Sequence, residues 1–201
     1  MIPEERRGSA GGRGGAVLAS IVLWLDRDPA YARGVDEEQR TDATLTGTER
    51  EQIESFLHDN RVEIAGLLSG LTEEQARRRL VPSLTTLLGL VKHAVFVERV
   101  WFDVALAGRT RADIGLPKAV EESFVLTDMD TVESVLTQYR QAWADADAVA
   151  ASFSLDDLAM HNRRGPLSLR WIYLHMIEEL ARHCGHGDIL REQILAADGS
   201  G

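Results

Sequence analysis

The sequence is poor in several features that define large classes of proteins. Its 201 residues include one cysteine, Cys184, which excludes a disulfide framework. Lys92 and Lys118 are the only lysines among 22 basic residues, and the formal net charge of −10 argues against binding to nucleic acid. No apolar run approaches the ~18 residues that a membrane span needs. We therefore expect a cytoplasmic protein that binds neither nucleic acid nor membrane.

The composition is otherwise that of a globular protein, with 44% hydrophobic and 27% charged residues. Residues 8–15 are rich in glycine, and residues 16–25 form a short apolar run. This run could be the core of a secretory signal peptide, but acidic residues precede it and charged residues follow it closely. We favour a flexible extension over residues 1–40 and a single domain over residues 41–201.

From residue 41 onward, apolar residues recur at spacings of three and four, which is typical of amphipathic helices. Capping pairs predict where helices begin, and no segment has a strong strand pattern. The expected fold is therefore all-α, a four-helix bundle. The expected helices follow Thr48 with Glu51, Thr72 with Gln75 (a short one), Leu84 (a buried helix to Ala107, closed by Gly108), Asp130 with Glu133, and Ser168 (to about Leu195).

The last helix carries polar residues where its buried seam should lie. Steps of three and four along it give Leu169, Ile172, Met176, Glu179, His183, His186 and Leu190. The ends of this seam are apolar, but its middle holds a carboxylate and two imidazoles. Burying an uncompensated charge costs several kcal/mol, as an order of magnitude, and a divalent cation is the simplest compensation.

Three residues could bind that cation. Glu179 and His183 are four residues apart and project from one face of their helix, with His175 at the edge of that face. His93 is the histidine of the second long helix and lies among apolar residues. Two nitrogens and one oxygen would leave a coordination position open, as in catalytic sites. Hydrogen-bonded core histidines, or a surface Glu–His pair, are the alternatives.

Other candidate residues have simpler interpretations. Cys184 points about 100° away from His183 around the helix and is expected to be a small buried side chain. His186, three residues after His183, is expected to line the open side of the metal site, with a fourth ligand as the alternative. We expect His58 and His161 to lie at the surface or in loops.

Two segments are distinctive, residues 83–102 (SLTTLLGLVKHAVFVERVWF) and 168–192 (SLRWIYLHMIEELARHCGHGDILRE). They resemble the DinB-like superfamily, in particular an actinobacterial branch related to mycothiol-dependent maleylpyruvate isomerase. The resemblance covers about residues 47–196. It implies a four-helix bundle with a three-ligand metal site, which falls on His93, Glu179 and His183 of this chain.

The resemblance also implies a function. A low-molecular-weight thiol, expected to be mycothiol, would be held as a thiolate and directed at a small electrophile, in a thiol S-transferase or isomerase reaction. Relatives carry Arg-Gly-Gln after the last ligand, where this chain has Cys-Gly-His. His186 is therefore a candidate catalytic residue, and Asp188 a candidate support for the ligands. The candidates for binding thiol or substrate are Arg99, Arg182 and Arg191, with solvated surface arginines as the alternative.

Two other functions remain open at this point. The chain could be a non-catalytic, stress-associated bundle that binds a metal or a partner, or it could catalyse metal-assisted hydrolysis. Mixed histidine and glutamate ligation suits zinc best, and also nickel, iron or manganese. A homodimer is compatible with the sequence.

Overall fold

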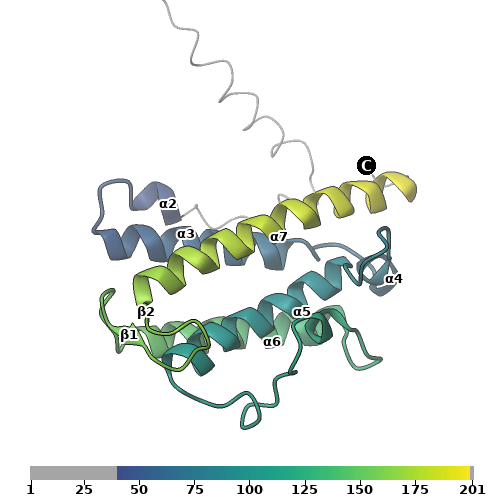
Figure 1. Ribbon diagram of the computed structural model, residues 1–201. Coiled ribbons are helices and arrows are strands. Elements are labelled where there is room, and N and C mark those ends of the chain that lie inside the picture. Colours follow the sequence, from purple (N-terminus) through teal and green to yellow (C-terminus); the bar gives the residue numbers. More distant parts are fainter. Residues whose placement is uncertain (1–39, 200–201) are drawn as a thin grey trace, which may run out of the picture. The chain divides into compact units, whose positions relative to one another are not determined.

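The computed structural model describes residues 40–199, and these residues confirm the all-α prediction (Figure 1). The predicted extension over residues 1–40 lies outside the described residues, apart from Arg40. None of the described helices is long and apolar enough to cross a membrane. The elements are α2 (Arg40–Ala43), α3 (Glu49–Gly66), α4 (Glu73–Arg77), α5 (Leu87–Glu98), η2 (Arg99–Leu106), η3 (Glu121–Phe124), α6 (Val132–Ala150), β1 (Leu158–Ala159), β2 (Leu167–Ser168) and α7 (Leu169–Ala197).

Two of the predicted capping boxes are confirmed. The hydroxyl of Thr48 accepts from the backbone of Glu51, and Thr72 pairs with Gln75 in the same way. The prediction for α6 is wrong, because Thr131 caps this helix and Ser134 completes the box. Asp130 has other partners, which are the backbone amide of Thr127 at 2.6 Å and the Lys92 ammonium at 2.8 Å.

The helix predicted over residues 84–107 is two helices of different geometry. Thr86 caps α5, so regular structure begins three residues later than expected. After Glu98 the chain continues as the π-helix η2, which spans eight residues. Gly108 then ends the segment with φ +76°, a conformation that strains other residues, and His161 packs against it. A π-helix is rare and is frequently found at functional sites.

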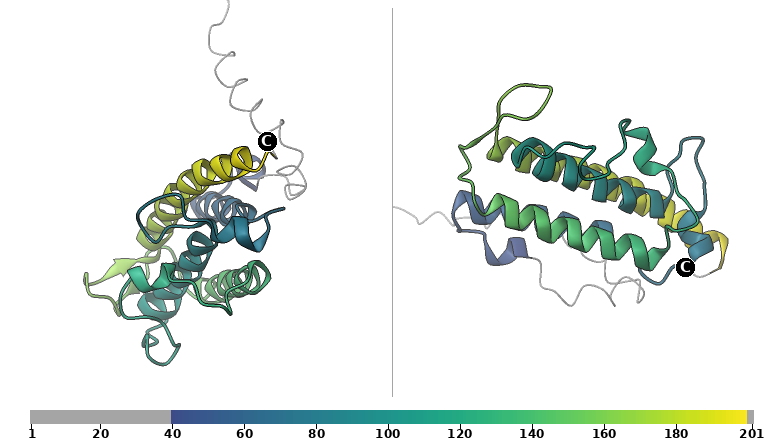
Figure 2. Two further views of the ribbon diagram at one scale, coloured as in Figure 1. Left: turned by 90° about the vertical axis from the view of Figure 1, so that its right-hand side faces the viewer. Right: turned by 90° about the horizontal axis from the view of Figure 1, so that it is seen from below.

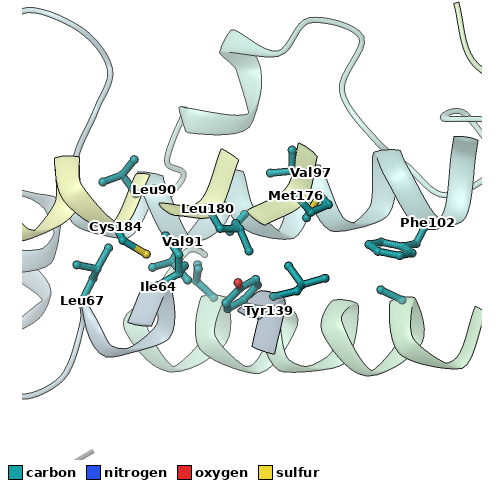
Figure 3. Close-up of a cluster of buried hydrophobic side chains, with 14 of the residues drawn as sticks. Ile64, Leu67, Leu90, Val91, Val97, Phe102, Tyr139, Met176, Leu180 and Cys184 are labelled. Atoms are coloured by element: carbon teal, nitrogen blue, oxygen red, sulfur yellow. The ribbon is translucent and has the colours of Figure 1, made fainter. Parts of the chain in front are cut away.

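Four long segments form the bundle, with α3 packed on α7 and α5 packed on both α6 and α7 (Figures 1 and 2). Figure 3 shows side chains of these helices, among them Leu67, Leu90, Tyr139 and Leu180, meeting in one apolar cluster. The approach of α3 to α7 is close at Gly187, where a Cβ atom would lie 2.3 Å from Leu67 Cδ1. A residue with a Cβ atom at this position would require the Leu67 side chain to move.

A short antiparallel pair of strands, which the sequence did not predict, precedes α7. Leu158 of β1 pairs with Ser168 of β2, and Ala159 pairs with Leu167. The pair closes a loop over residues 160–166, which carries His161 and Arg164. The strands are too short to show an alternating pattern of apolar residues.

One buried ion pair was also not predicted from the sequence. The guanidinium of Arg61 on α3 donates to both carboxylate oxygens of Glu98 at 2.7 Å, and the two side chains are 2% and 0% exposed. Arg61 also donates to Asp147 on α6. Burial opposes the charge of Arg61, but Glu98 and Asp147 together raise its pKa above the ordinary value. The chain thus supplies the cation for this carboxylate itself.

Candidate metal centre

The structure brings His93 of α5 together with Glu179 and His183 of α7, the three residues that the sequence singled out. Glu179 Oε1 lies 3.3 Å from His93 Nε2 and 3.1 Å from His183 Nε2. One ligand atom from each residue lies within 4.8 Å of the other two. Two features fix this geometry. Glu179 and His183 are one turn apart and therefore lie on the same face of α7, and α5, which carries His93, packs against α7.

A serine in the connection between η2 and α6 orients the ring of His93. His93 Nδ1 lies 2.7 Å from Ser123 Oγ, and that hydroxyl itself donates to the carbonyl of Val120 at 2.5 Å. Because the serine proton is used in this way, His93 Nδ1 must carry the proton that it shares with Ser123. The lone pair of a neutral His93 is therefore on Nε2, which faces Glu179.

Two acceptors consequently face each other at the centre of the cluster. When an imidazole proton is present between them, hydrogen bonds from His183 and His93 hold the pKa of Glu179 well below its usual range, although burial opposes them, and Glu179 is a carboxylate at neutral pH. A carboxylate oxygen 3.3 Å from an imidazole lone pair is repulsive unless a cation lies between them. That cation must be either a proton on an imidazole or a metal ion.

Two of the three donor–donor separations fit a tetrahedral metal ion. Bonds of ~2.0–2.1 Å to histidine nitrogen and carboxylate oxygen give tetrahedral edges of roughly 3.3 Å. The separations of 3.3 and 3.1 Å from Glu179 Oε1 to the two Nε2 atoms are close to this value. Two nitrogens and one oxygen also form the mixed set that zinc accepts.

The cluster is enclosed on the His93 side and more open on the α7 side. Phe124 of η3 stacks on the His93 ring with 4.1 Å between centroids, and Phe96 stacks at 6.0 Å. The side chain of His93 is 3% exposed, whereas those of Glu179 and His183 are 18% and 15% exposed. His183 Nδ1 is buried and has no hydrogen-bond partner among residues 40–199. A ligand would therefore approach from the α7 side.

The structure places the other predicted site residues at different distances from this cluster. His186 is exposed on α7, and its ring centroid lies 5.7 Å from that of His183. Arg182 pairs with Glu178, and its Nη1 lies 3.9 Å from Glu179 Oε2. Both residues flank the open side of the cluster.

The remaining arginines have other contacts. Arg99 lies in the first turn of η2, with its Nε 3.5 Å from Asp103. Arg191 is 4% exposed and donates to the carbonyl of Leu67, about 12 Å beyond His183 along α7. The structure therefore places Arg191 in the packing of α7 on α3 and away from the cluster.

Four other residues considered in the sequence differ in how far they are buried. Cys184 is buried, as expected, and burial raises the pKa of its thiol. His161 is exposed in the loop before β2, also as expected. The prediction for His58 is wrong, because this residue is buried with its ring edge against Trp143. Asp188 is exposed and interacts electrostatically with Arg191.

Ser123 and Phe124, which hold His93, were not predicted, because they lie in a segment expected to be a loop. The aromatic surroundings of His175 were not predicted either. This residue stacks on Trp171 with 5.0 Å between centroids and meets Trp101 edge-on. The spacing of His175, Trp171 and Glu179 at four-residue steps on one helix was the available signal.

A model of the mycothiol-S-transferase family matches residues 52–196, from the first turn of α3 to the last turn of α7. The chain belongs to the mycothiol-S-transferase family. No curated protein matches the chain. Membership confirms the resemblance to the DinB-like proteins of actinobacteria, and it links the fold to mycothiol and to transferase chemistry. The matched region contains His93, Glu179 and His183.

Proposed function

We propose that the chain binds one divalent metal ion through His93, Glu179 and His183 and transfers a low-molecular-weight thiol, with mycothiol as cosubstrate, to a small electrophile. The observation that carries this proposal is the pair of facing acceptors, Glu179 Oε1 and His93 Nε2, 3.3 Å apart. A cation, either an imidazole proton or a metal ion, is required between them, and among metal ions the donor set suits zinc best. Family membership supports the thiol and the reaction class.

A metal ion at this position would lower the pKa of a bound thiol and so supply a thiolate near neutral pH. The residues of the chain would orient the ligands, offset charge and receive the substrates. Ser123 keeps the His93 lone pair directed inward, and the Glu179 carboxylate offsets part of the positive charge. The open side of the cluster, flanked by Arg182 and His186, would receive the thiol and the electrophile.

In this reaction the thiol sulfur forms a bond to an electrophilic carbon and loses its proton. His186 is the proposed acceptor of that proton, because its ring is exposed beside His183. With a substrate that contains a polarised double bond, the proton would return to the neighbouring carbon. With a substrate that carries a leaving group, that group would depart with its electron pair.

Metal content is the first test. Protein purified without an affinity tag should contain about one divalent ion per chain by mass spectrometry, and His183→Ala should lose it. His161→Ala, which changes an exposed histidine of the loop before β2, is the matched control and should keep the ion. Protein that neither contains a metal nor takes up zinc or nickel at near-neutral pH would contradict the proposal.

Thiol transfer is the second test. The metal-loaded protein should accelerate the reaction of mycothiol with a chromogenic electrophile, and His183→Ala should not. A protein that binds the metal without accelerating this reaction would favour the alternative, a non-catalytic metal-binding bundle.

A further inference from the structure

Next to the metal centre, three aromatic rings and one guanidinium form a cluster that we call the aromatic box. The box consists of Trp101 of η2, Trp171 and His175 of α7, and Arg164 of the loop before β2. The indoles of Trp101 and Trp171 are 5.5 Å apart between centroids, and His175 lies 4.7 Å from the first and 5.0 Å from the second. The guanidinium carbon of Arg164 lies 6.0 and 5.4 Å from the two indole centroids.

Two local departures from regular helical structure assemble this box. Trp101 is presented by the π-helix η2, and Arg164 by the loop that the β1–β2 pair closes. Trp171 and His175 lie in the first two turns of α7, where Ser168 caps the helix. A π-helix is frequently associated with function, and Trp101, the third residue of η2, contacts Trp171 of α7.

The box lies directly beside the proposed reaction centre. His175 is one helical turn before Glu179 on α7, and the two side chains interact electrostatically. The rings of the box are half-buried, so each keeps part of its surface open to a ligand. A molecule lying on these rings would be about one helical turn from Glu179.

Arg164 gives the box a positive charge that is not already neutralised. Its side chain is exposed, and it has no carboxylate partner among residues 40–199. Arg182, by contrast, is paired with Glu178. A guanidinium over two indoles can stack on a planar ligand and donate to an anionic group on it at the same time.

We propose that the aromatic box binds the electrophile, and that this substrate is a planar aromatic or conjugated molecule that carries a carboxylate. Its planar part stacks on one indole of the Trp101–Trp171 pair, whose planes are inclined at 58°, and meets the other at an angle. Its carboxylate accepts hydrogen bonds from Arg164. The assignment of the ligand as the electrophile rests on the proposed function, because it takes the neighbouring metal centre as the thiol site. The binding of such a ligand does not depend on that function and can be measured separately.

The test uses 2-naphthoate, an unreactive planar carboxylate, and isothermal titration calorimetry with the protein as purified. We expect 2-naphthoate to bind more tightly than its neutral analogue 2-naphthalenemethanol and its non-planar analogue cyclohexanecarboxylate. Arg164→Gln should weaken the binding of 2-naphthoate about tenfold, the value of a hydrogen bond to a charged group. The same variant should change the affinity for 2-naphthalenemethanol by less than about twofold, because this ligand has no carboxylate to accept a hydrogen bond from Arg164.

Matched variants keep this test specific. Arg163→Gln changes the neighbouring arginine of the same loop and should bind 2-naphthoate as the unmodified protein does. Trp171→Leu should lose binding, whereas Trp143→Leu, in a half-buried tryptophan at another place in the bundle, should keep it. Thermal unfolding of each variant shows whether it remains folded, and the exposed Arg164 is not expected to affect folding.

Repeating the titration with EDTA separates the two proposals. Binding that persists after the metal is removed, and that depends on Arg164 and Trp171, supports the box whatever the metal centre does. If 2-naphthoate does not bind, or if it binds Arg164→Gln as tightly as the unmodified protein, the box proposal is wrong while thiol transfer to other electrophiles still stands.

Discussion

A fully buried carboxylate of this bundle, Glu98, and a half-buried one, Glu179, differ in the origin of their positive partner. Glu98 receives both of its hydrogen bonds from Arg61, so an internal ion pair neutralises its charge. Glu179 faces the Nε2 atoms of His93 and His183, and the Ser123 contact directs the His93 proton away from it. The comparison shows that a buried carboxylate alone does not indicate a ligand site. What distinguishes Glu179 is that one of its two imidazole neighbours, His93, faces it with an acceptor, so that a cation would complete the contact.

The largest effect is expected from removing the internal cation. Arg61→Met should destabilise the protein by about 3–5 kcal/mol, because it leaves the fully buried Glu98 without a positive partner. Chemical denaturation measures the loss, and the double variant Arg61→Met/Glu98→Met should recover most of it. Metal content should not change. If Arg61→Met were as stable as the exposed control Arg140→Gln, Arg61 would not be the group that stabilises the charge of Glu98.

The corresponding change at the other carboxylate should affect metal binding and leave stability nearly intact. Glu179→Gln should weaken metal affinity by at least about 100-fold, since loss of a supporting residue alone costs about 10–100-fold. Its unfolding free energy without metal should change by less than about 1 kcal/mol, because the site is partly exposed and the amide keeps the shape. Competition with a chromophoric chelator measures the affinity. A matched change on α7, Glu178→Gln, should leave it unaltered.

Ser123→Ala tests the origin of the His93 orientation. Without the serine hydroxyl, His93 can rotate or change tautomer, and metal affinity should fall by about 10–100-fold, less than for Glu179→Gln. The same chelator competition measures it, with Ser83→Ala as the control in an exposed segment. An affinity equal to that of the unmodified protein would show that the packing of Phe124 alone orients the ring.

The two carboxylates also differ in how far the sequence predicts their partners. Helical periodicity placed Glu179 and His183 on one face and singled out His93 in an apolar segment, because each relation is local or compositional. The same signal exists for Arg61, which stands at the spacing of Leu57 and Ile64, both buried. Arg61 was nevertheless assigned no role from the sequence, because charged residues are abundant and nothing local shows which of them meet across the bundle.

Other features depend on contacts that no short window of sequence contains. Ser123 reaches His93 from thirty residues away, and Arg164 meets Trp101 through a loop closed by two very short strands. The change from α5 to the π-helix η2 leaves the apolar pattern of the segment unchanged. The fold was therefore predictable from periodicity and caps, and the proposed metal ligands from polar residues on apolar faces. The residues that support those ligands were not.

A third carboxylate, Asp130, is intermediate between Glu98 and Glu179. Its substitution has the smallest expected effect of those considered. Burial opposes its charge, but Lys92 and the backbone and hydroxyl of Thr127 lower the pKa of Asp130 below the usual value. A carboxyl with a lowered folded-state pKa stabilises the protein above its unfolded-state pKa, near ~3.9, and this contribution is lost as the pH falls through the folded-state pKa. Asp130→Asn should therefore cost on the order of 1 kcal/mol at pH 7.

Denaturation of Asp130→Asn beside the unmodified protein at several pH values gives the measurement. The difference in unfolding free energy should be constant from neutral pH down to roughly pH 4 and should shrink below it. Asp113→Asn, at an exposed residue, is the control. A difference that grew on acidification would mean that Asp130 is protonated in the folded protein. Asp130 would then resemble neither Glu98 nor Glu179, because Lys92 would not be neutralising it.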